Sequence, residues 1–459
     1  MNLPRLIIAD EMKAGTVSPG LILVYAMKRA GIKIKVFTCA RSEADMRLLK
    51  LLLEESFVSL DAYTCGSIKN LKTLFQNVAD PAALNIILTP LGDRPEEGFI
   101  QVRPDALDLA KALNCGIVPI FVADASAILT TNATTTALAK FEEAGENHVL
   151  GVIFSSVKNP REYQLLEQDY GRKTPVLSLG YIPKEIERPM AALQDLYGTT
   201  SSTRLMQIKS AALQLASTTH QIEWQILEAF GYLRQEWTPP QEAVFASKKL
   251  KVAVVGEKTL SLESANSSEL FRFLGCDVVD YDPWQTAFPM DVEVVYFPHS
   301  LGSLYADRLL SHQSFCLGIK QSFAANKLIF VNGASSPLFG QFYTASDGKK
   351  HEALGFFPFH GSYSSLKDSG ENYKIEIRGT ADTIFSKREE KMRGYSLDYV
   401  RIGNPGNLVP PVWAYRDIRK DIELGSSGWV KGYCFITDLH LELWSNIETV
   451  NRWLSLRKR

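Results

Sequence analysis

The sequence predicts an α/β protein with two doubly wound domains, residues 1–233 and 250–459, joined by a linker at 234–249. In each half, short apolar strands alternate with amphipathic helices, which is typical of a parallel sheet covered on both faces. The pattern stops at "RQEWTPPQEAVFASKK" and then begins again. The two prolines and the absence of a sustained period in that segment indicate a linker.

The first domain begins with the strand "RLIIA", the loop "ADEMKAGTVSPG" at residues 9–20 and the helix "LILVYAMKRAG". Its later strands read "KIKVFT", "LNIILT", "GIVPIFVAD", "HVLGVIFSS" and "TPVLSLG". Helical stretches such as "EADMRLLKLLLEES" and "PDALDLAKALN" separate them, and residues 203–233 are predicted to form one helix. Because apolar residues run through these strands with little alternation, we expect a buried parallel sheet.

The second domain repeats this pattern with the strand "KLKVAVVGE", the helix "SSELFRFLG" and the strands "CDVVDYD" and "EVVYFPH". The helix "LGIKQSFAAN" and the strand "KLIFVNG" follow. Residues 351–443 are richer in β-type segments, including "YKIEIRG" and "GYCFITDLHLELW", and "NIETVNRWLSL" is predicted to be the last helix.

The composition is that of an ordinary globular protein, with 459 residues, 46% hydrophobic and 22% charged. Fifty basic residues against 51 acidic ones give a net charge of −1, so we expect neither a nucleic acid nor an anionic membrane as a partner. The six cysteines are far apart and form no C-x-x-C or Cys/His cluster, so we expect no disulfide framework and no metal site. Without an apolar leader or spanning segment, the chain is expected to be cytoplasmic.

Several framework segments resemble those of the cobyrinic acid a,c-diamide synthase family. In the first half they are "GIVPIFVADAS", "HVLGVIFSSV" and "TPVLSLGYIP", and in the second half "KLIFVNGASSPLFG", "RGYSLDY" and "TDLHLELWSN". The resemblance covers about the whole chain. It implies an N-terminal dethiobiotin-synthetase-like domain of phosphate-loop type and a C-terminal class I glutamine-amidotransferase-like (flavodoxin-like) domain. Such enzymes amidate tetrapyrrole carboxylates through an acyl phosphate, with ammonia released from glutamine.

The resemblance places the phosphate loop of this family on residues 9–20, where its functional positions are changed. Thr16 falls at the last loop glycine, Val17 at the lysine and Ser18 at the magnesium-binding hydroxyl. A valine cannot replace a cation that contacts phosphates, because each charge-assisted contact contributes about 1.5–3 kcal/mol. Lys13 is either a substitute cation or a solvated loop lysine.

Other positions of the nucleotide site are also altered. The strand end that carries a catalytic glutamate in the family reads Leu88-Thr89-Pro90, and the nearby Asp93 is either a substitute or a solvated loop aspartate. Ser155 stands at the adenine-contacting asparagine. Asp124 is retained, although an aspartate that closes a strand is as often a helix cap as a ligand, and Gly15 is a further candidate residue of this site. We therefore expect ordinary ATP binding to be impaired.

The amidotransferase half lacks its nucleophile. Glutamine hydrolysis needs a thiolate on a sharp strand-to-helix turn, together with a histidine and an acid. The nucleophile position holds Gly333, and we interpret Ser335 and Ser336 beyond it as helix-capping residues. His440 and Glu442 have the H-x-E spacing of class I amidotransferases and share one strand face. Without a cysteine, we interpret them as residual structure or a hydrogen-bonded surface pair.

Two further segments differ from the family. The glycine-rich turn that shapes its oxyanion hole is replaced by "PHSLGS", in which His299 has no partner that the sequence identifies. In "RGYSLDY", Arg393, Tyr395 and Tyr399 are candidates for binding a flat anionic ligand, because arginine stacks on rings and pairs with carboxylates. The same aromatic residues are equally suited to filling a core between two sheets.

These observations favour a catalytically degenerate relative of the diamide synthases. It would act as a partner subunit, scaffold or carrier in a tetrapyrrole pathway, with a protein partner or a second copy of itself, a tetrapyrrole ligand and no enzymatic cofactor. The alternative is an active amidating synthase that uses ATP and Mg²⁺ through Lys13, with free ammonia or a separate glutaminase. A third interpretation, an assembly-type ATPase, is disfavoured by the second domain and the missing lysine.

Overall fold

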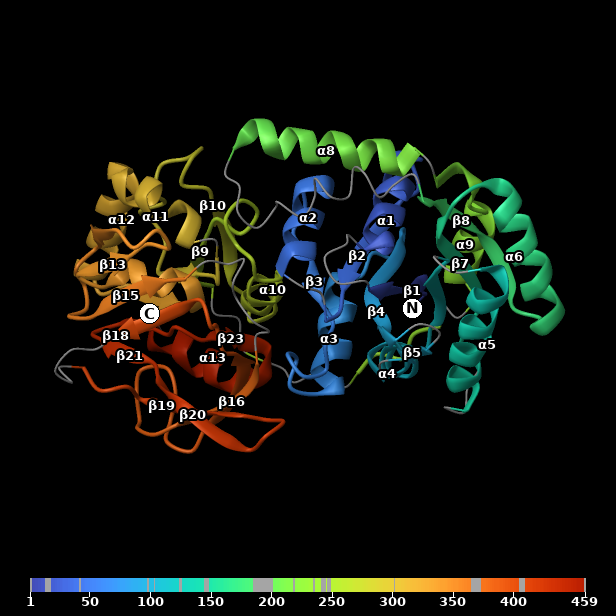
Figure 1. Ribbon diagram of the computed structural model, residues 1–459. Coiled ribbons are helices and arrows are strands. Elements are labelled where there is room, and N and C mark those ends of the chain that lie inside the picture. Colours follow the sequence, from blue (N-terminus) through green and yellow to red (C-terminus); the bar gives the residue numbers. More distant parts are fainter. Residues whose placement is uncertain are drawn as a thin grey trace. The chain divides into compact units, whose positions relative to one another are not determined.

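The computed structural model separates into two compact units (Figure 1). Unit 1 comprises Met1–Asp61 and Phe75–Pro240, and unit 2 comprises Ala62–Leu74 and Gln241–Arg459. Residues 62–74 lie inside the range expected for the first domain but pack with unit 2. The structure describes residues 2–12, 18–40, 43–96, 99–102, 104–123, 126–143, 148–184, 201–217, 219–233, 236–240, 245, 249–300, 302–364, 373–403 and 409–457.

Unit 1 is built on one sheet whose main path has the order β3-β2-β4-β1-β6-β7-β8, with all of these strands parallel. The strands are β1 (Arg5–Met12), β2 (Ile34–Thr38), β3 (Val58–Ser59), β4 (Leu84–Glu96), β6 (Gly116–Val122), β7 (Gly151–Val157) and β8 (Leu177–Pro183). β5 (Phe99–Val102) pairs antiparallel with β4. Every residue of β6 is buried, which explains its uninterrupted apolar sequence.

The helices of unit 1 are α1 (Pro19–Arg29), α2 (Glu43–Leu53), α4 (Pro104–Leu113), α5 (Ala127–Glu143), α6 (Pro160–Lys173), α8 (Ser202–Ser217) and α9 (Trp224–Gly231), and α3 (Ile68–Val78) crosses the boundary between the units. In α1, residues 20–27 are all buried, because the helix packs against the sheet and against α8. The single helix predicted at 203–233 is wrong, since a 3₁₀ turn at Thr219–Gln221 lies between α8 and α9.

Unit 2 has a second parallel sheet, of order β10-β9-β11-β12-β22-β21, in which only β21 is antiparallel. Its strands are β9 (Lys251–Val255), β10 (Asp277–Tyr281), β11 (Val294–Phe297), β12 (Leu328–Val331), β21 (Trp429–Lys431) and β22 (Cys434–Ile436). Its helices are α10 (Asn266–Phe273), α11 (Gly302–Ser311), α12 (Gln313–Ala324) and α13 (Ile447–Leu454). The predicted fold class, with two doubly wound α/β domains, is confirmed.

Two antiparallel-rich sheets complete unit 2, as the β-type sequence of residues 351–443 predicts. One has the order β14-β13-β15-β18 and the other the order β20-β19-β16-β17-β23. Their strands are β13 (Phe342–Thr344), β14 (Lys350–Glu352), β15 (His360–Tyr363), β16 (Lys374–Gly379), β17 (Lys391–Tyr395), β18 (Val400–Gly403), β19 (Trp413–Asp417), β20 (Ile422–Ser427) and β23 (His440–Glu442). The β-type segment at 432–444 divides between two sheets, as β22 and β23.

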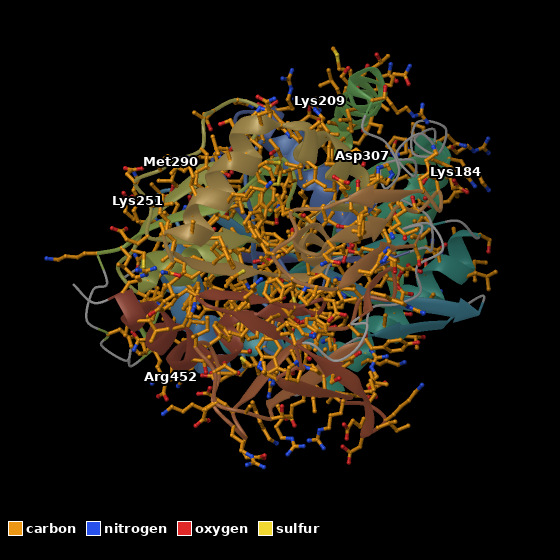
Figure 2. All side chains as sticks on the ribbon, turned by 90° about the vertical axis from the view of Figure 1, so that its left-hand side faces the viewer. Lys184, Lys209, Lys251, Met290, Asp307 and Arg452 are labelled. Atoms are coloured by element: carbon orange, nitrogen blue, oxygen red, sulfur yellow. The ribbon has the colours of Figure 1, made fainter. Side chains whose placement is uncertain are left out.

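Figure 2 shows that side chains fill the space between the ribbons. The partly exposed residues Met290 and Lys251, the second of which is ion-paired with Asp291, lie toward one side of that view. The core of unit 2 includes Val295 and Phe297 of β11 and Val331 of β12. Within the described part of the chain, no helix is long and apolar enough to cross a lipid bilayer.

Candidate functional site

The candidate site of unit 2 lies where β11 and β12 end and β23 begins. Because the carboxyl ends of parallel strands meet at one edge of a sheet, His299 after β11 lies next to Gly333 after β12. Gly333 has φ +57°, in the left-handed region that favours glycine, and it begins the 3₁₀ turn Gly333–Phe339. The chain therefore turns sharply at Gly333, between β12 and this 3₁₀ turn, at a residue that has no side chain.

The imidazole of His299 occupies the space that a side chain at position 333 would need. A Cβ atom placed on Gly333 would lie 2.6 Å from Nδ1 of His299, 3.0 Å from its Cγ and 3.1 Å from its Cβ. Cβ atoms in proteins do not approach other heavy atoms as closely as 2.6 Å. A cysteine therefore does not fit at position 333 while His299 keeps this position.

His299 also binds the backbone donor next to Gly333. Its Nδ1 accepts a hydrogen bond of 3.2 Å from the N–H of Ala334, and its Nε2 lies 2.9 Å from the hydroxyl of Tyr399. Because a backbone N–H can only donate, Nδ1 carries no proton, and Nε2–H donates to Tyr399. In nucleophile-elbow enzymes the N–H after the nucleophile forms part of the oxyanion hole. Here His299 takes this donor.

His440 stacks on His299, with ring centroids 4.7 Å apart and an interplanar angle of 27°. Nε2 of His440 lies 3.9 Å from Glu263 Oε2 and 3.7 Å from Glu442 Oε1, both beyond hydrogen-bond length. This nitrogen is buried and has no hydrogen-bond partner among the described residues. Burial and, secondarily, the His299 imidazole lower the pKa of His440 well below its ordinary value. His440 is therefore neutral at pH 7.

Glu263 is a site residue that sequence reasoning missed, because an isolated loop glutamate carries no signal. Its Oε1 accepts hydrogen bonds from the hydroxyls of Ser267 and Tyr296. Its Oε2 accepts the backbone N–H of His299 at 2.9 Å and the side-chain amide of Asn332 at 3.2 Å. Burial raises the pKa of Glu263, and these hydrogen bonds oppose the shift. The carboxyl thus ties the ends of β11 and β12 together.

The structure contradicts one interpretation of residues at this site and one of two alternatives for another pair. Ser335 and Ser336 do not cap a helix, because Asn332 is the N-cap and both serines lie inside the turn, where Ser335 donates to the carbonyl of Pro298. His440 and Glu442 do share one face of β23, but they are largely buried and are not hydrogen-bonded to each other. The alternative of a hydrogen-bonded surface pair is therefore wrong, and that of residual structure stays a prediction.

In unit 1, an acidic side chain lies at the position where a nucleotide-binding protein holds phosphate. Asp10 is fully buried near the end of β1, and its Oδ2 accepts hydrogen bonds from the Ser18 hydroxyl and from the N–H of Gly20, 2.9 Å away. Helix amino termini bind anions, and here an internal carboxylate takes that place. The carboxylate of Asp10 thus lies at the amino end of α1 in the described part of the chain, where the Ser18 hydroxyl donates to it.

Of the remaining nucleotide-site candidates, the structure describes the side chain of Ser155. Ser155 is buried in β7, and its hydroxyl donates to the carbonyl of Phe121 at 3.3 Å. Residues 13–17, which include Lys13, Gly15, Thr16 and Val17, lie outside the described residues, and so do Asp124 and the side chain of Asp93. A second carboxylate near the end of β1 is also engaged, because Glu11 Oε2 accepts the N–H of Val122 at 3.0 Å.

The three residues proposed to bind a flat anion have separate environments. The Tyr399 hydroxyl is hydrogen-bonded to His299, whereas Arg393 lines a cavity beside Tyr63. Tyr395 lies between them, with its ring centroid 5.7 Å from that of His440 and 5.8 Å from that of Tyr63.

Comparison with known proteins finds relatives that align with nearly the whole length of this chain. No protein-family profile matches the chain. Cobyrinate a,c-diamide synthase of Caldanaerobacter subterraneus subsp. tengcongensis is 21% identical over 445 residues, covering 96% of this chain and 94% of the relative. The Thermoplasma volcanium protein of the same name is 24% identical over 470 residues, covering 99% and 97%. The chain resembles the diamide synthases. The resemblance expected from the sequence is thereby confirmed.

Solved structures align with parts of the chain. A glutamine amidotransferase structure covers 45% of this chain and 97% of its own, with a TM-score of 0.34 and 10% identity. A ParA family ATPase from Chlorobium tepidum TLS covers 47% and 99%, with a TM-score of 0.27 and 10% identity. The fold assignment rests on the sheet orders of the two units. The two diamide synthases named above match both units together.

Proposed function

We propose that this protein is a non-catalytic relative of the diamide synthases that serves as a partner subunit, scaffold or ligand carrier in a tetrapyrrole pathway. The observation that carries the proposal is the position of His299. Its imidazole fills the space of the nucleophile and takes the Ala334 N–H that would stabilise an oxyanion. Formation of an acyl-enzyme requires a nucleophile in that space and a free N–H donor for the oxyanion, both accessible to glutamine.

The nucleotide site supports the same proposal independently. A phosphate group at the amino end of α1 would meet the carboxylate of Asp10 there, which already holds Ser18 and the Gly20 N–H. The negative charges of the phosphate and of the Asp10 carboxylate would repel each other, and the Ser18 hydroxyl and the Gly20 N–H already donate to Asp10. Two unrelated chemistries, glutamine hydrolysis and phosphoryl activation, are thus disfavoured in one chain whose two α/β cores remain intact. A fold survives such changes to its sites.

The first test is enzymatic. The purified chain is incubated with glutamine, and released ammonia is measured in the presence and absence of Mg²⁺-ATP. We expect no release above the uncatalysed rate. The melting temperature is then followed against Mg²⁺-ATP concentration, since a ligand at one hundred times its Kd would stabilise the protein by about 2.7 kcal/mol. Turnover of glutamine, or a saturable shift with Mg²⁺-ATP, would favour the active-synthase alternative.

The second test addresses the pathway. The chain is captured from its native cell extract, and the absorbance spectrum and protein content of the bound fraction are recorded. A Soret-type band supports a tetrapyrrole carrier, and a stoichiometric protein without a chromophore supports a partner subunit or scaffold. A capture with neither, from cells that make tetrapyrroles, contradicts the proposed pathway.

A further inference from the structure

A cavity of about 330 Å³ lies in unit 2 between Tyr63 and the five-stranded sheet, and His299 is not among its lining residues. We propose that this cavity binds the carboxylate of a small molecule with an apolar body, and that Arg393 is the group that recognises it. The inference is independent of the proposed function, because it concerns binding at Arg393 and not amidation.

Arg393 has more hydrogen-bond donors than partners. Its Nη1 donates to the backbone carbonyl of Tyr63 at 3.2 Å, and its Cζ lies 5.4 Å from the centroid of the Tyr63 ring. In the described part of the chain, no carboxylate lies within ion-pair distance of its guanidinium group, which has five N–H donors. A guanidinium in a cavity with most of its fork available matches a carboxylate in two-point geometry.

The other cation of the cavity differs, because its charge is already compensated. Arg416 contacts Glu376 Oε1 at 2.7 Å and Asp421 Oδ1 at 2.5 Å, both of which line the cavity. Lys391 lies 3.1 Å from the same Glu376 oxygen. The lining carboxylates are thus held by cations other than Arg393, which leaves Arg393 as the group that an incoming anion would neutralise.

The rest of the lining selects the kind of anion. The Tyr63 hydroxyl contacts the carbonyls of Ile375 and Gly394 at 2.6 and 2.8 Å, which fixes the ring against the sheet. Ala62 and the exposed side chain of Ile418 add apolar surface. A phosphate dianion would be repelled by the nearby carboxylates, whereas a single carboxylate with an apolar body suits both parts of the lining.

Benzoate and its uncharged isostere benzamide test this proposal. Binding to the purified full chain is followed by ligand-observed NMR titration, with inorganic phosphate as a third probe. We expect saturable benzoate binding about tenfold tighter than that of benzamide or phosphate. Benzamide cannot form the charge-assisted pair with Arg393, and the carboxylates near the cavity repel phosphate. Arg393→Gln should reduce benzoate binding to the benzamide level.

Arg378→Gln is the matched control, because Arg378 lies on the adjacent strand β16, is exposed and pairs with Glu389 outside the cavity lining. It should leave benzoate binding unchanged. Arg393→Lys keeps the charge and loses the fork, so it should bind benzoate with intermediate affinity even if Arg393→Gln fails to fold. No saturable benzoate binding, equal binding of benzamide or phosphate, or an Arg393→Lys protein that binds like the wild type would overturn the proposal. Glutamine turnover would instead contradict the proposed function alone.

Discussion

The contact between His299 and Gly333 predicts a large cost for restoring the nucleophile alone. In Gly333→Cys, the new Cβ lies 2.6 Å from Nδ1 of His299, and the residue must keep φ near +57°. The left-handed conformation costs about 1–2 kcal/mol and overpacking of a core about 1–3 kcal/mol, so the expected loss is about 2–5 kcal/mol. At about 2–4 °C per kcal/mol, the melting temperature should fall by about 4–20 °C.

A matched control separates the two contributions. Gly432 has φ +59°, and among the described residues no atom beyond its chain neighbours lies within 4 Å of the point where a Cβ would stand. Gly432→Cys therefore introduces the backbone strain without the clash. Urea unfolding of both variants should show that Gly333→Cys loses more stability, by about 1–3 kcal/mol. Equal losses would refute the argument that His299 fills the nucleophile space.

The double variant His299→Ala/Gly333→Cys completes a thermodynamic cycle. His299→Ala removes the clash together with the two hydrogen bonds that join His299 to the Ala334 N–H and to the Tyr399 hydroxyl. The double variant should therefore lose less unfolding free energy than the two single variants lose in sum, by about 1–3 kcal/mol. Additive losses, within about 0.5 kcal/mol, would show that positions 299 and 333 do not compete for one space.

Three further predictions follow from buried polar groups. Asp10→Ala should lower stability by about 1–3 kcal/mol in chemical unfolding, because the Ser18 hydroxyl loses its acceptor; an unchanged midpoint would contradict the assigned contact. The pKa of His440 is lower in the folded than in the unfolded state, so its contribution to stability is complete above the unfolded value of about 6.5 and is lost as the pH falls below it. The wild type should therefore lose up to about 1.4 kcal/mol per pH unit more than His440→Gln between pH 6.5 and 5.5, and equal pH profiles would refute this. Tyr399→Phe should cost about 1 kcal/mol, measured by urea unfolding, because Nε2–H of His299 loses its acceptor, and a stabilised variant would contradict the tautomer assigned to His299.

Much of the fold could be predicted from local sequence, because strands such as β6 and β12 are buried on both faces and therefore appear as uninterrupted apolar runs. The separation of α8 from α9 could not, since the residues between them retain a helical pattern and tertiary packing decides where the helix breaks. Helix α11 was not predicted either, because it begins at Gly302 and glycine is a poor helix former.

The candidate site was predicted less completely than the fold. The sequence identifies the loss of the cysteine at position 333, because the resemblance supplies the position. It does not reveal that His299 replaces the missing side chain, since this contact joins residues 34 positions apart through the ends of two neighbouring strands. Nor does it reveal the role of Asp10, because a short carboxylate at a strand end has no distinctive pattern until the following helix turns its amino end toward it.

The discontinuity of unit 2 affects how this chain is made and how it can be divided. The ring of Tyr63 is anchored to carbonyls that lie 312 and 331 positions later in the chain. At translation speeds of about 5–20 residues per second, Tyr63 leaves the ribosome about 15–65 seconds before its acceptors exist. Segment 62–74 can therefore pack with the rest of unit 2 only after the later strands have been synthesised. A gene fragment that starts at residue 241 encodes unit 2 without this segment.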